Sequence, residues 1–262
     1  MTDSTFDKLD GDVARFTIDR PTRLGAYTPA LCSELLSAIT AYAHDDELRC
    51  LILTGTGRGF CTGGDVSPDA GFDLNGQVAR ARDLRTNAHA VVLALYHLDK
   101  PVVCAINGFA VNGGLAFALC ADIRVAAASA RLGDTSARTG LLPDEGGAWL
   151  FPRVLGQERA YRMVALSELY SADEALLRGL ISEVVEDDRL QDRAVEIARS
   201  LAAGPPLALR AVKTMMRRAA MSTLESSLVD AQQAVLWVGP SEDAQEGKAA
   251  FLAKRPARFQ GR

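Results

Sequence analysis

Apolar positions along the first two thirds of the chain alternate between two patterns, short buried-strand runs and helical faces. Between residues 13 and 18, Ala14, Phe16 and Ile18 alternate with Arg15 and Thr17, which predicts a half-buried strand. Thr28-Pro29 then has the composition of an N-cap and a first helical turn. It precedes a predicted helix whose apolar face consists of Leu31, Leu35, Ile39 and Tyr42.

The same reasoning predicts the remaining elements. Strands are expected at 51–54, 102–106, 123–127 and 181–185, and helices at 79–98, 115–121, 157–166 and from the capping box at 171–174 to Gly179. Beyond Asp188 only helical patterns follow, interrupted at Gly204-Pro205-Pro206 and Gly239-Pro240. The order predicts an α/β fold of repeated strand-strand-helix units with a helical C-terminal region. A composition shift near 201–206 predicts two parts, 1–201 and 202–262.

Composition narrows the function classes. The 262 residues are 48% hydrophobic and 24% charged, which is ordinary for a globular protein, and the net charge of -4 gives no electrostatic footprint for nucleic acid or an anionic membrane. No apolar run has the length that a bilayer span requires. The polar, acidic start at residues 1–8 does not have the composition of a signal peptide. We therefore expect a cytoplasmic protein without nucleic-acid or membrane partners.

The cysteines and histidines argue against disulfides and metals. Five cysteines, an odd number, stand mostly inside apolar runs, which is typical of reduced, buried thiols. None forms a Cys-x-x-Cys pair, and His44, His89 and His97 lack metal-ligand spacing. The sequence therefore predicts no metal site.

Two glycine-rich segments, at 59–65 and 107–115, are the strongest functional signal in the sequence. Each follows a predicted strand and leads toward a stretch that could be helical. Such turns leave backbone N–H groups unpaired. Two of them in one domain can direct two N–H groups at the same oxygen, which is the geometry of an oxyanion hole.

Gly55-Thr56-Gly57 offers a competing interpretation as a dinucleotide-binding turn. That fingerprint requires Gly-x-Gly-x-x-Gly running directly into a helix. Here the sixth position is Phe60, and more loop follows. A tight turn that needs glycine dihedrals accounts for Gly55 and Gly57 equally well.

The glycine segments also carry a resemblance to a known family. The first is similar to the crotonase (enoyl-CoA hydratase/isomerase) loop ending in Gly-x-Asp, and the second to that family's Asn-Gly-x-Ala-x-Gly-Gly-Gly turn. The resemblance extends in order through 20–26, 120–126, 140–147 and 254–256. It implies a crotonase-like spiral at 1–201, followed by a helical oligomerisation region at 202–262. The expected assembly is a homotrimer or a hexamer.

By this resemblance, the backbone N–H groups of Cys61 and Gly113 would hold the thioester oxygen of an acyl-CoA. The Cys61 thiol has no evident activating base and is not interpreted as a nucleophile. Coenzyme A would enter as part of the substrate, with no other cofactor. The positions that match substrate or CoA contacts are Arg23, Leu24, Ala26, Cys61, Gly63, Gly64, Asp65, Val66, Gly113, Phe251 and Lys254. Asp65 and Asp122 match acidic positions interpreted as caps or turns.

The family's hydratases activate water with two glutamates, and the matching positions here are Ala116 and Ser136. Neither replaces a carboxylate, since alanine exchanges no proton and an unpartnered serine is a poor base. Asp144 falls where isomerase-type members carry a single carboxylate base, with Glu145 as the second choice. A solvated Pro-Asp-Glu-Gly turn at 143–146 is the alternative without function.

The sequence thus predicts an enoyl-CoA isomerase that uses Asp144 as its base. A hydratase, another thioester-enolate reaction, and a non-catalytic acyl-CoA-binding protein remain alternatives. The C-terminal apolar residues allow two interpretations, a subunit interface or internal core. These residues are Leu224, Leu228, Ala231, Val235 and Trp237.

Overall fold

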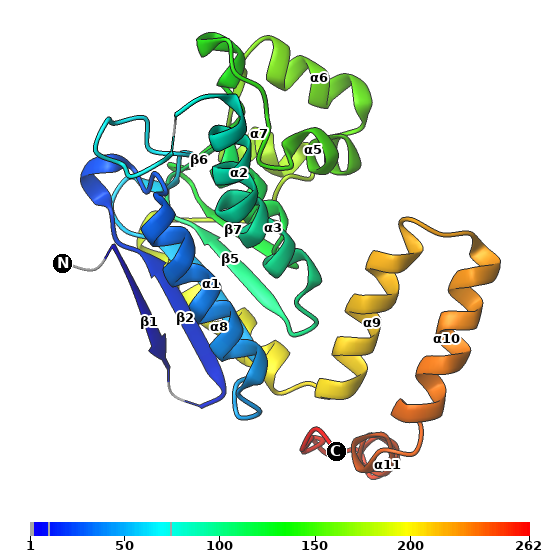
Figure 1. Cartoon of the computed structure of the whole chain (residues 1–262). Helices are drawn as coiled ribbons and strands as arrows, with labels where there is room; N and C mark the ends of the chain where they lie inside the picture. Colours follow the sequence, from blue (N-terminus) through cyan, green and yellow to red (C-terminus); the bar gives the residue numbers. More distant parts are fainter. Residues whose placement is uncertain (1–2, 10, 74) are drawn as a thin grey trace.

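The computed structural model describes residues 3–9, 11–73 and 75–262, so the first two residues of the polar start lie outside the described residues. Figure 1 shows an α/β core from which the C-terminal helices extend. A six-stranded sheet has the order β1-β2-β3-β5-β7-β10. Its strands are β1 (Ser4–Lys8), β2 (Val13–Ile18), β3 (Cys50–Gly55), β5 (Val102–Ile106), β7 (Ile123–Ala127) and β10 (Glu183–Val185).

A smaller sheet has the order β4-β6-β8-β9. Its strands are β4 (Gly59–Cys61), β6 (Phe109–Val111), β8 (Arg131–Gly133) and β9 (Leu169–Ser171). Successive turns of the chain give one strand to each sheet, first β3 and β4, then β5 and β6, then β7 and β8. Neighbouring strands are parallel both among β3, β5 and β7 of the large sheet and among β4, β6 and β8 of the small sheet. The predicted spiral of strand-strand-helix units is confirmed.

Within the described ranges, eight helices surround the sheets before the C-terminal region. They are α1 (Pro29–His44), α2 (Gln77–Thr86), α3 (Ala88–His97), α4 (Gly113–Leu119), α5 (Gly147–Leu155), α6 (Gln157–Ala165), α7 (Ala172–Leu177) and α8 (Leu190–Ala202). Three short 3₁₀ turns are η1 (Pro21–Arg23), η2 (Ser136–Thr139) and η3 (Asp187–Arg189).

The core has one layer on each face of the large sheet. Leu51 and Leu53 of β3 join the cluster that includes the buried faces of α1, α3 and α4, whereas Cys50 and Ile52 join the cluster with α8. Successive side chains of a strand point to opposite faces, so a continuous apolar run fits a strand covered on both sides. All five cysteines are buried free thiols, as predicted.

Local signals set some of the helix ends. The Thr28 hydroxyl accepts a hydrogen bond from Leu31 N (3.1 Å), and Ser171 with Glu174 forms the predicted capping box. The single helix predicted at 79–98 is wrong, because Asn87 divides it into α2 and α3. The Asn87 side-chain amide donates to the Asp83 carbonyl (2.9 Å), and such local hydrogen bonds compete with helical ones.

The competing dinucleotide-binding interpretation is also wrong. The glycine turn after β3 leads into β4 at Gly59 rather than into a helix. That turn therefore presents no helix N-terminus to a pyrophosphate.

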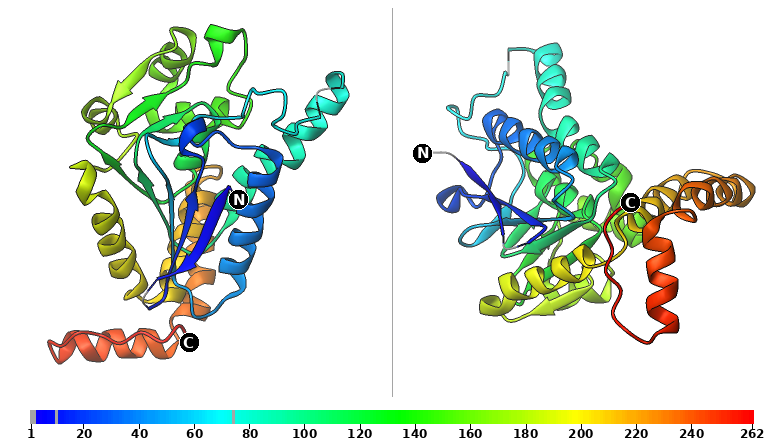
Figure 2. Two further views of the ribbon diagram at one scale, coloured as in Figure 1. Left: turned by 90° about the vertical axis from the view of Figure 1, so that its left-hand side faces the viewer. Right: turned by 90° about the horizontal axis from the view of Figure 1, so that it is seen from below.

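The C-terminal region consists of α9 (Pro206–Ala219), α10 (Leu224–Val238) and α11 (Glu242–Leu252). α9 and α10 form a hairpin beside the core, and α11 runs across its end (Figures 1 and 2). The proposed division at 201/202 falls in the last turn of α8, just before the connection to α9, and it stays a prediction. Among the described residues, no helix combines the length and the apolar composition that crossing a membrane would need.

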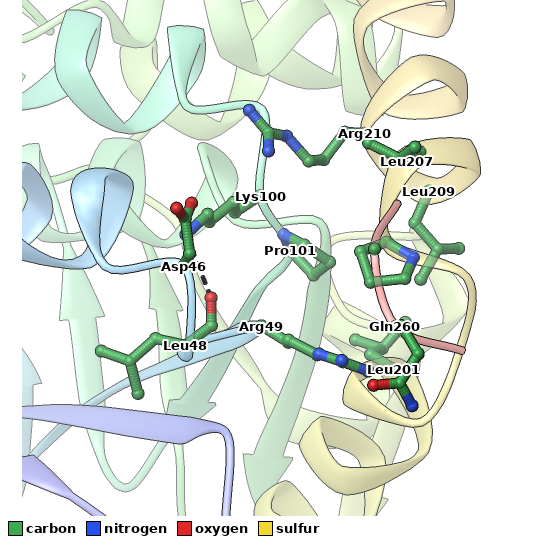
Figure 3. Close-up of a pocket in the computed structure, with 12 residues that line it drawn as sticks. Asp46, Leu48, Arg49, Lys100, Pro101, Leu201, Leu207, Leu209, Arg210 and Gln260 are labelled. Carbon is green, nitrogen blue, oxygen red and sulfur yellow. Dashed lines mark hydrogen bonds between the residues drawn. The ribbon is translucent and has the colours of Figure 1, made fainter. Parts of the chain in front are cut away.

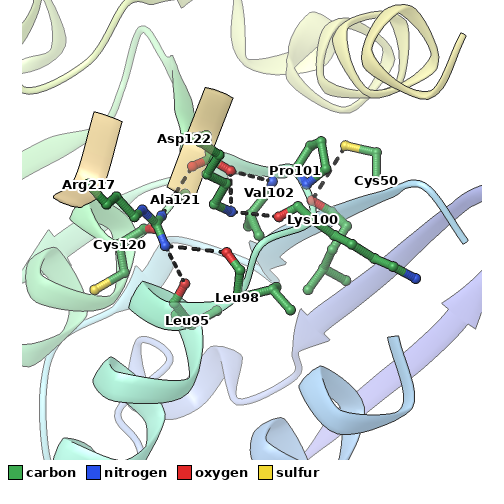
Figure 4. Close-up of polar contacts among 12 residues, drawn as sticks. Cys50, Leu95, Leu98, Lys100, Pro101, Val102, Cys120, Ala121, Asp122 and Arg217 are labelled. Atoms are coloured by element: carbon green, nitrogen blue, oxygen red, sulfur yellow. Dashed lines mark hydrogen bonds and ion pairs between the residues drawn. The ribbon is translucent and has the colours of Figure 1, made fainter. Parts of the chain in front are cut away.

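An ionic cluster that includes the buried Lys213 attaches α9 to the core (Figure 4). Asp122 accepts a hydrogen bond from Val102 N (2.8 Å) and forms ion pairs with Lys213 (2.6 Å) and Arg217 (3.1 Å). Burial is the largest cause that lowers the pKa of Lys213, to about 8. The predicted structural role of Asp122 is confirmed, and the cluster fixes the position of α9.

Candidate functional site

The two glycine segments meet because their strands are neighbours. β3 and β5 pair in parallel, so the loops that follow them leave the same edge of the large sheet. β4 and β6 then pair in parallel as well, with Cys61 opposite Ala110. Cys61 and Gly113, the predicted oxyanion donors, therefore lie at the same end of the small sheet.

The approach of these segments requires glycine. A Cβ on Gly114 would lie 1.9 Å from the Cys61 carbonyl oxygen, and a Cβ on Gly63 would lie 3.5 Å from Gly113 N. Gly113 is the first residue of α4, and the first N–H groups of a helix have no intrahelical acceptor. The structure thus brings together Cys61, Gly63 and Gly113 as the sequence predicted.

Glu145 lies against the same turn. Its side chain is buried, and a Cβ on Gly113 would lie 2.6 Å from Glu145 Oε1. The Tyr27 hydroxyl donates to the same oxygen atom (3.0 Å). The Glu145 carboxyl therefore borders the place where a thioester oxygen would meet the Gly113 N–H.

Tyr27 is a site residue that the sequence did not reveal. Its backbone N–H donates to the Gly63 carbonyl (2.9 Å), and its own carbonyl accepts from Asp65 N (2.9 Å). These bonds fix Tyr27 to the first glycine segment while its hydroxyl reaches the 144–145 turn. Tyr27 carried no signal for this role beyond its place directly after the family-like stretch at 20–26.

Asp144 and Glu145 form a coupled pair of carboxyls. Burial is the largest cause that raises the pKa of Glu145 to about 7, followed by the charge of Asp144 and a hydrogen bond to its side chain. Asp144 itself is half-buried, and its backbone carbonyl accepts a hydrogen bond from His89 Nε2 (2.7 Å). These two carboxyls are the groups beside the second glycine turn that can exchange protons.

The two positions that match the hydratase glutamates are buried in the structure. Ala116 lies on α4, and the Ser136 hydroxyl donates to Oδ1 of Asp134. Asp134 is a second residue that sequence reasoning missed; its place directly after β8 was the one available signal.

The segment expected to contact CoA lies beside the first glycine segment. A Cβ on Gly59 would lie 2.3 Å from the Leu24 carbonyl oxygen, and Ala26 is buried next to Tyr27. Arg23 and Val66 have exposed side chains. Asp65 is held by Arg20 (2.9 Å) and accepts from Ser67 N (2.9 Å), which fits a structural turn residue.

Phe251 and Lys254 are not brought to this site. Phe251 is exposed near the end of α11, and Lys254 follows that helix. In Figure 1, α11 lies at the opposite end of the molecule from β6. A contact of these residues with CoA would therefore have to come from a neighbouring copy of the chain.

A separate cavity of about 250 Å³ lies at the other edge of the large sheet (Figure 3). Its lining includes Leu48 and Pro101, which precede β3 and β5, whereas the glycine segments follow those strands. The Lys100 ammonium donates to three backbone carbonyls, and Arg210 pairs with Asp99 (2.6 Å). The Lys100 and Arg210 side chains that line this cavity are therefore already bound to groups of the protein itself.

Comparisons of the sequence and the fold with those of known proteins identify related chains. A family model described as enoyl-CoA hydratase/isomerase matches residues 8–262. The 1,2-epoxyphenylacetyl-CoA isomerase of Escherichia coli (strain K12) is 37% identical over 266 residues, covering 100% of both chains. A probable enoyl-CoA hydratase of Rhodobacter capsulatus is 37% identical over 255 residues, covering 97% of each. The crystal structure of an enoyl-CoA hydratase from Bacillus anthracis has a TM-score of 0.94 at 30% identity, covering 99% of this chain and 100% of that one.

Proposed function

This chain belongs to the enoyl-CoA hydratase/isomerase family, and we propose that within it the protein moves the double bond of an enoyl-CoA thioester. C2, the carbon next to the thioester carbonyl, loses a proton to give an enolate. Two backbone N–H groups, from Cys61 and Gly113, would bind the enolate oxygen. One such donor typically contributes about 3–4 kcal/mol to the lowering of the barrier.

One carboxylate suffices for the proton transfers. Asp144 would take a proton from C2 of a 3-enoyl-CoA and return it to C4, which gives the 2-enoyl-CoA. In the opposite sense it would take the proton from C4 and return it to C2. The same atom can serve both steps because the enolate stays bound between them. The observation that supports this proposal is the Asp144–Glu145 pair, whose Glu145 carboxyl packs against Gly113.

Glu145 is the alternative base. Burial raises its pKa to about 7, which is well matched to proton transfer near neutral pH. Asp144 is preferred because its side chain is less buried than that of Glu145 and because it stands where isomerase-type members of the family carry their single carboxylate base.

The first test is a substrate screen. Purified protein should convert 3-enoyl-CoA thioesters to 2-enoyl-CoA thioesters of at least one chain length, and it should hydrate crotonyl-CoA very slowly or not at all. Neither Ala116 nor Ser136 supplies the carboxylate that activates water. Hydration on the order of 10 per second or more would show that Asp144 or Glu145 activates water and would favour the hydratase alternative.

A binding protein without activity is the second candidate. It would bind several acyl-CoA thioesters, measured by calorimetry, while none of them turned over. The buried carboxyl pair argues against this outcome, because a thioester-binding pocket gains nothing from a carboxyl that is costly to ionise.

The assembly is proposed to be a homotrimer or a hexamer. α10 has no fully buried residue, and its large apolar side chains Leu224, Leu228, Val235 and Trp237 are about half or more exposed. They are therefore not internal core in the single chain, and exposed apolar patches of this kind mark interfaces.

Light scattering is expected to give the mass of three or six chains. Leu228→Glu places a charge on this face and should shift the protein toward smaller species, whereas a Glu-to-Gln change at the exposed Glu158 should not. A stable wild-type monomer at micromolar concentration would contradict the proposal. We place the protein in the cytoplasm because its five thiols are free and buried, and we propose CoA, as part of the substrate, with no further cofactor.

A further inference from the structure

Asp134 carries a polar atom that the rest of the fold does not satisfy. Its side chain is fully buried. Oδ1 accepts hydrogen bonds from the backbone N–H (3.0 Å) and the hydroxyl of Ser136. Oδ2 is buried without a partner, one of two such side-chain atoms among residues 3–9, 11–73 and 75–262. Buried polar atoms of this kind call for an explanation, since nearly all others in proteins are paired.

An ionised Asp134 would leave this oxygen as an uncompensated buried charge, which is the most costly arrangement for a carboxyl. A proton on Oδ2 removes the charge and leaves the two hydrogen bonds at Oδ1 intact. Burial raises the pKa of Asp134, and the charge of Asp144 raises it further, whereas the Ser136 hydrogen bonds lower it. Geometry and electrostatics therefore agree on a neutral side chain.

The loop that carries Asp134 is connected to the oxyanion turn. Thr135 N donates to Asn112 Oδ1 (2.7 Å), and Asn112 N donates to the Gly133 carbonyl (3.1 Å). Asn112 directly precedes Gly113, the proposed donor to the thioester oxygen. The charge of Asp144 acts on the side chains of both Asp134 and Glu145.

We propose that Asp134 is a positioning residue that keeps its proton on Oδ2, so that no second negative charge develops beside the side chain of Asp144. This inference rests on the proposed function, in which Asp144 is the base. Asp134 exchanges no proton with the substrate. A neutral Asp134 does not repel the negative charge that passes from Asp144 to the enolate during each proton transfer.

The pH profile of kcat/KM tests this role. When Asp134 ionises as the pH rises, a second charge develops near Asp144 and the enolate, so the wild-type rate should fall. Asp134→Asn cannot ionise and keeps an acceptor for Ser136, so the fall attributed to Asp134 should disappear, with a loss at neutral pH below about tenfold. Ser136→Ala removes a hydrogen bond that favours the ionised form and should move the fall to higher pH.

A readout without substrate separates this inference from the proposed function. With ¹³C-labelled aspartate, the side-chain carbon of Asp134, assigned by its loss in Asp134→Asn, should show the shift of a protonated acid at neutral pH. An ionised signal at neutral pH would overturn the proposal, even if the isomerase activity is found. A protonated signal would stand even if no enoyl-CoA turned over. A loss of 100-fold or more in Asp134→Asn, with an unchanged pH profile, would also overturn it.

Discussion

Asp144→Asn is expected to lower kcat for double-bond migration by about 10²–10⁴-fold, the usual contribution of a general base. The amide keeps the shape and hydrogen-bonding capacity of the side chain but cannot accept a proton. Binding of the acyl-CoA should change little, because the oxyanion donors of Cys61 and Gly113 are backbone groups. The measurement is steady-state turnover of a 3-enoyl-CoA, with thioester affinity determined separately by calorimetry.

Glu145→Gln is the matched control for this experiment, since it makes the same chemical change one residue away. Its loss of kcat should be clearly smaller. A larger loss at Glu145 than at Asp144 would transfer the role of the base to Glu145. If neither variant affected a substrate that turns over, the single-carboxylate mechanism would be wrong.

Glu145→Gln is also expected to stabilise the protein at pH 8 by about 3 kcal/mol, an effect that should vanish near pH 4. Burial raises the pKa of Glu145 from an ordinary 4.5 to about 7. Between these values the folded state binds more protons than the unfolded state, so stability falls as the pH rises through this window. Each pKa unit corresponds to about 1.4 kcal/mol. Glutamine remains neutral and can still accept from Tyr27.

Denaturant unfolding of both proteins at pH 4 and pH 8 measures this difference. Glu158→Gln, at a solvent-exposed position on α6, controls for the general loss of a negative charge. Equal stabilities of the wild type and Glu145→Gln at both pH values would mean that Glu145 ionises in the folded protein without cost. The burial of the Glu145 carboxyl against Gly113 would then not raise its pKa.

The central strands of the large sheet were predictable from the sequence because they are apolar runs. The polar edge strand β1 was not predicted, and β10 is shorter than the predicted 181–185. Strands β5 and β7 have the predicted bounds, and β3 differs by a residue at either end. The four strands of the small sheet have three residues each, too few for any periodicity to develop. They form because the glycine segments bring them into register, which is a tertiary effect.

The site was predictable as far as it depends on backbone chemistry. The glycine segments signal close approach, and Gly114 against the Cys61 carbonyl shows why no larger residue fits. The contacts of Tyr27 with Glu145 join residues 118 positions apart, and no local pattern encodes such a pair. Asp134 was missed for a related reason, since its importance comes from complete burial rather than from spacing.

The hydrogen bond from Tyr27 to Glu145 gives the protein an intrinsic optical indicator. The phenol ring absorbs in the near ultraviolet, and its spectrum depends on the charge of the oxygen that its hydroxyl contacts. Because the pKa of Glu145 is about 7, this ring senses a carboxyl that changes charge near neutrality. Difference spectra against Tyr27→Phe would therefore follow occupancy of the pocket without a label, a dye or turnover.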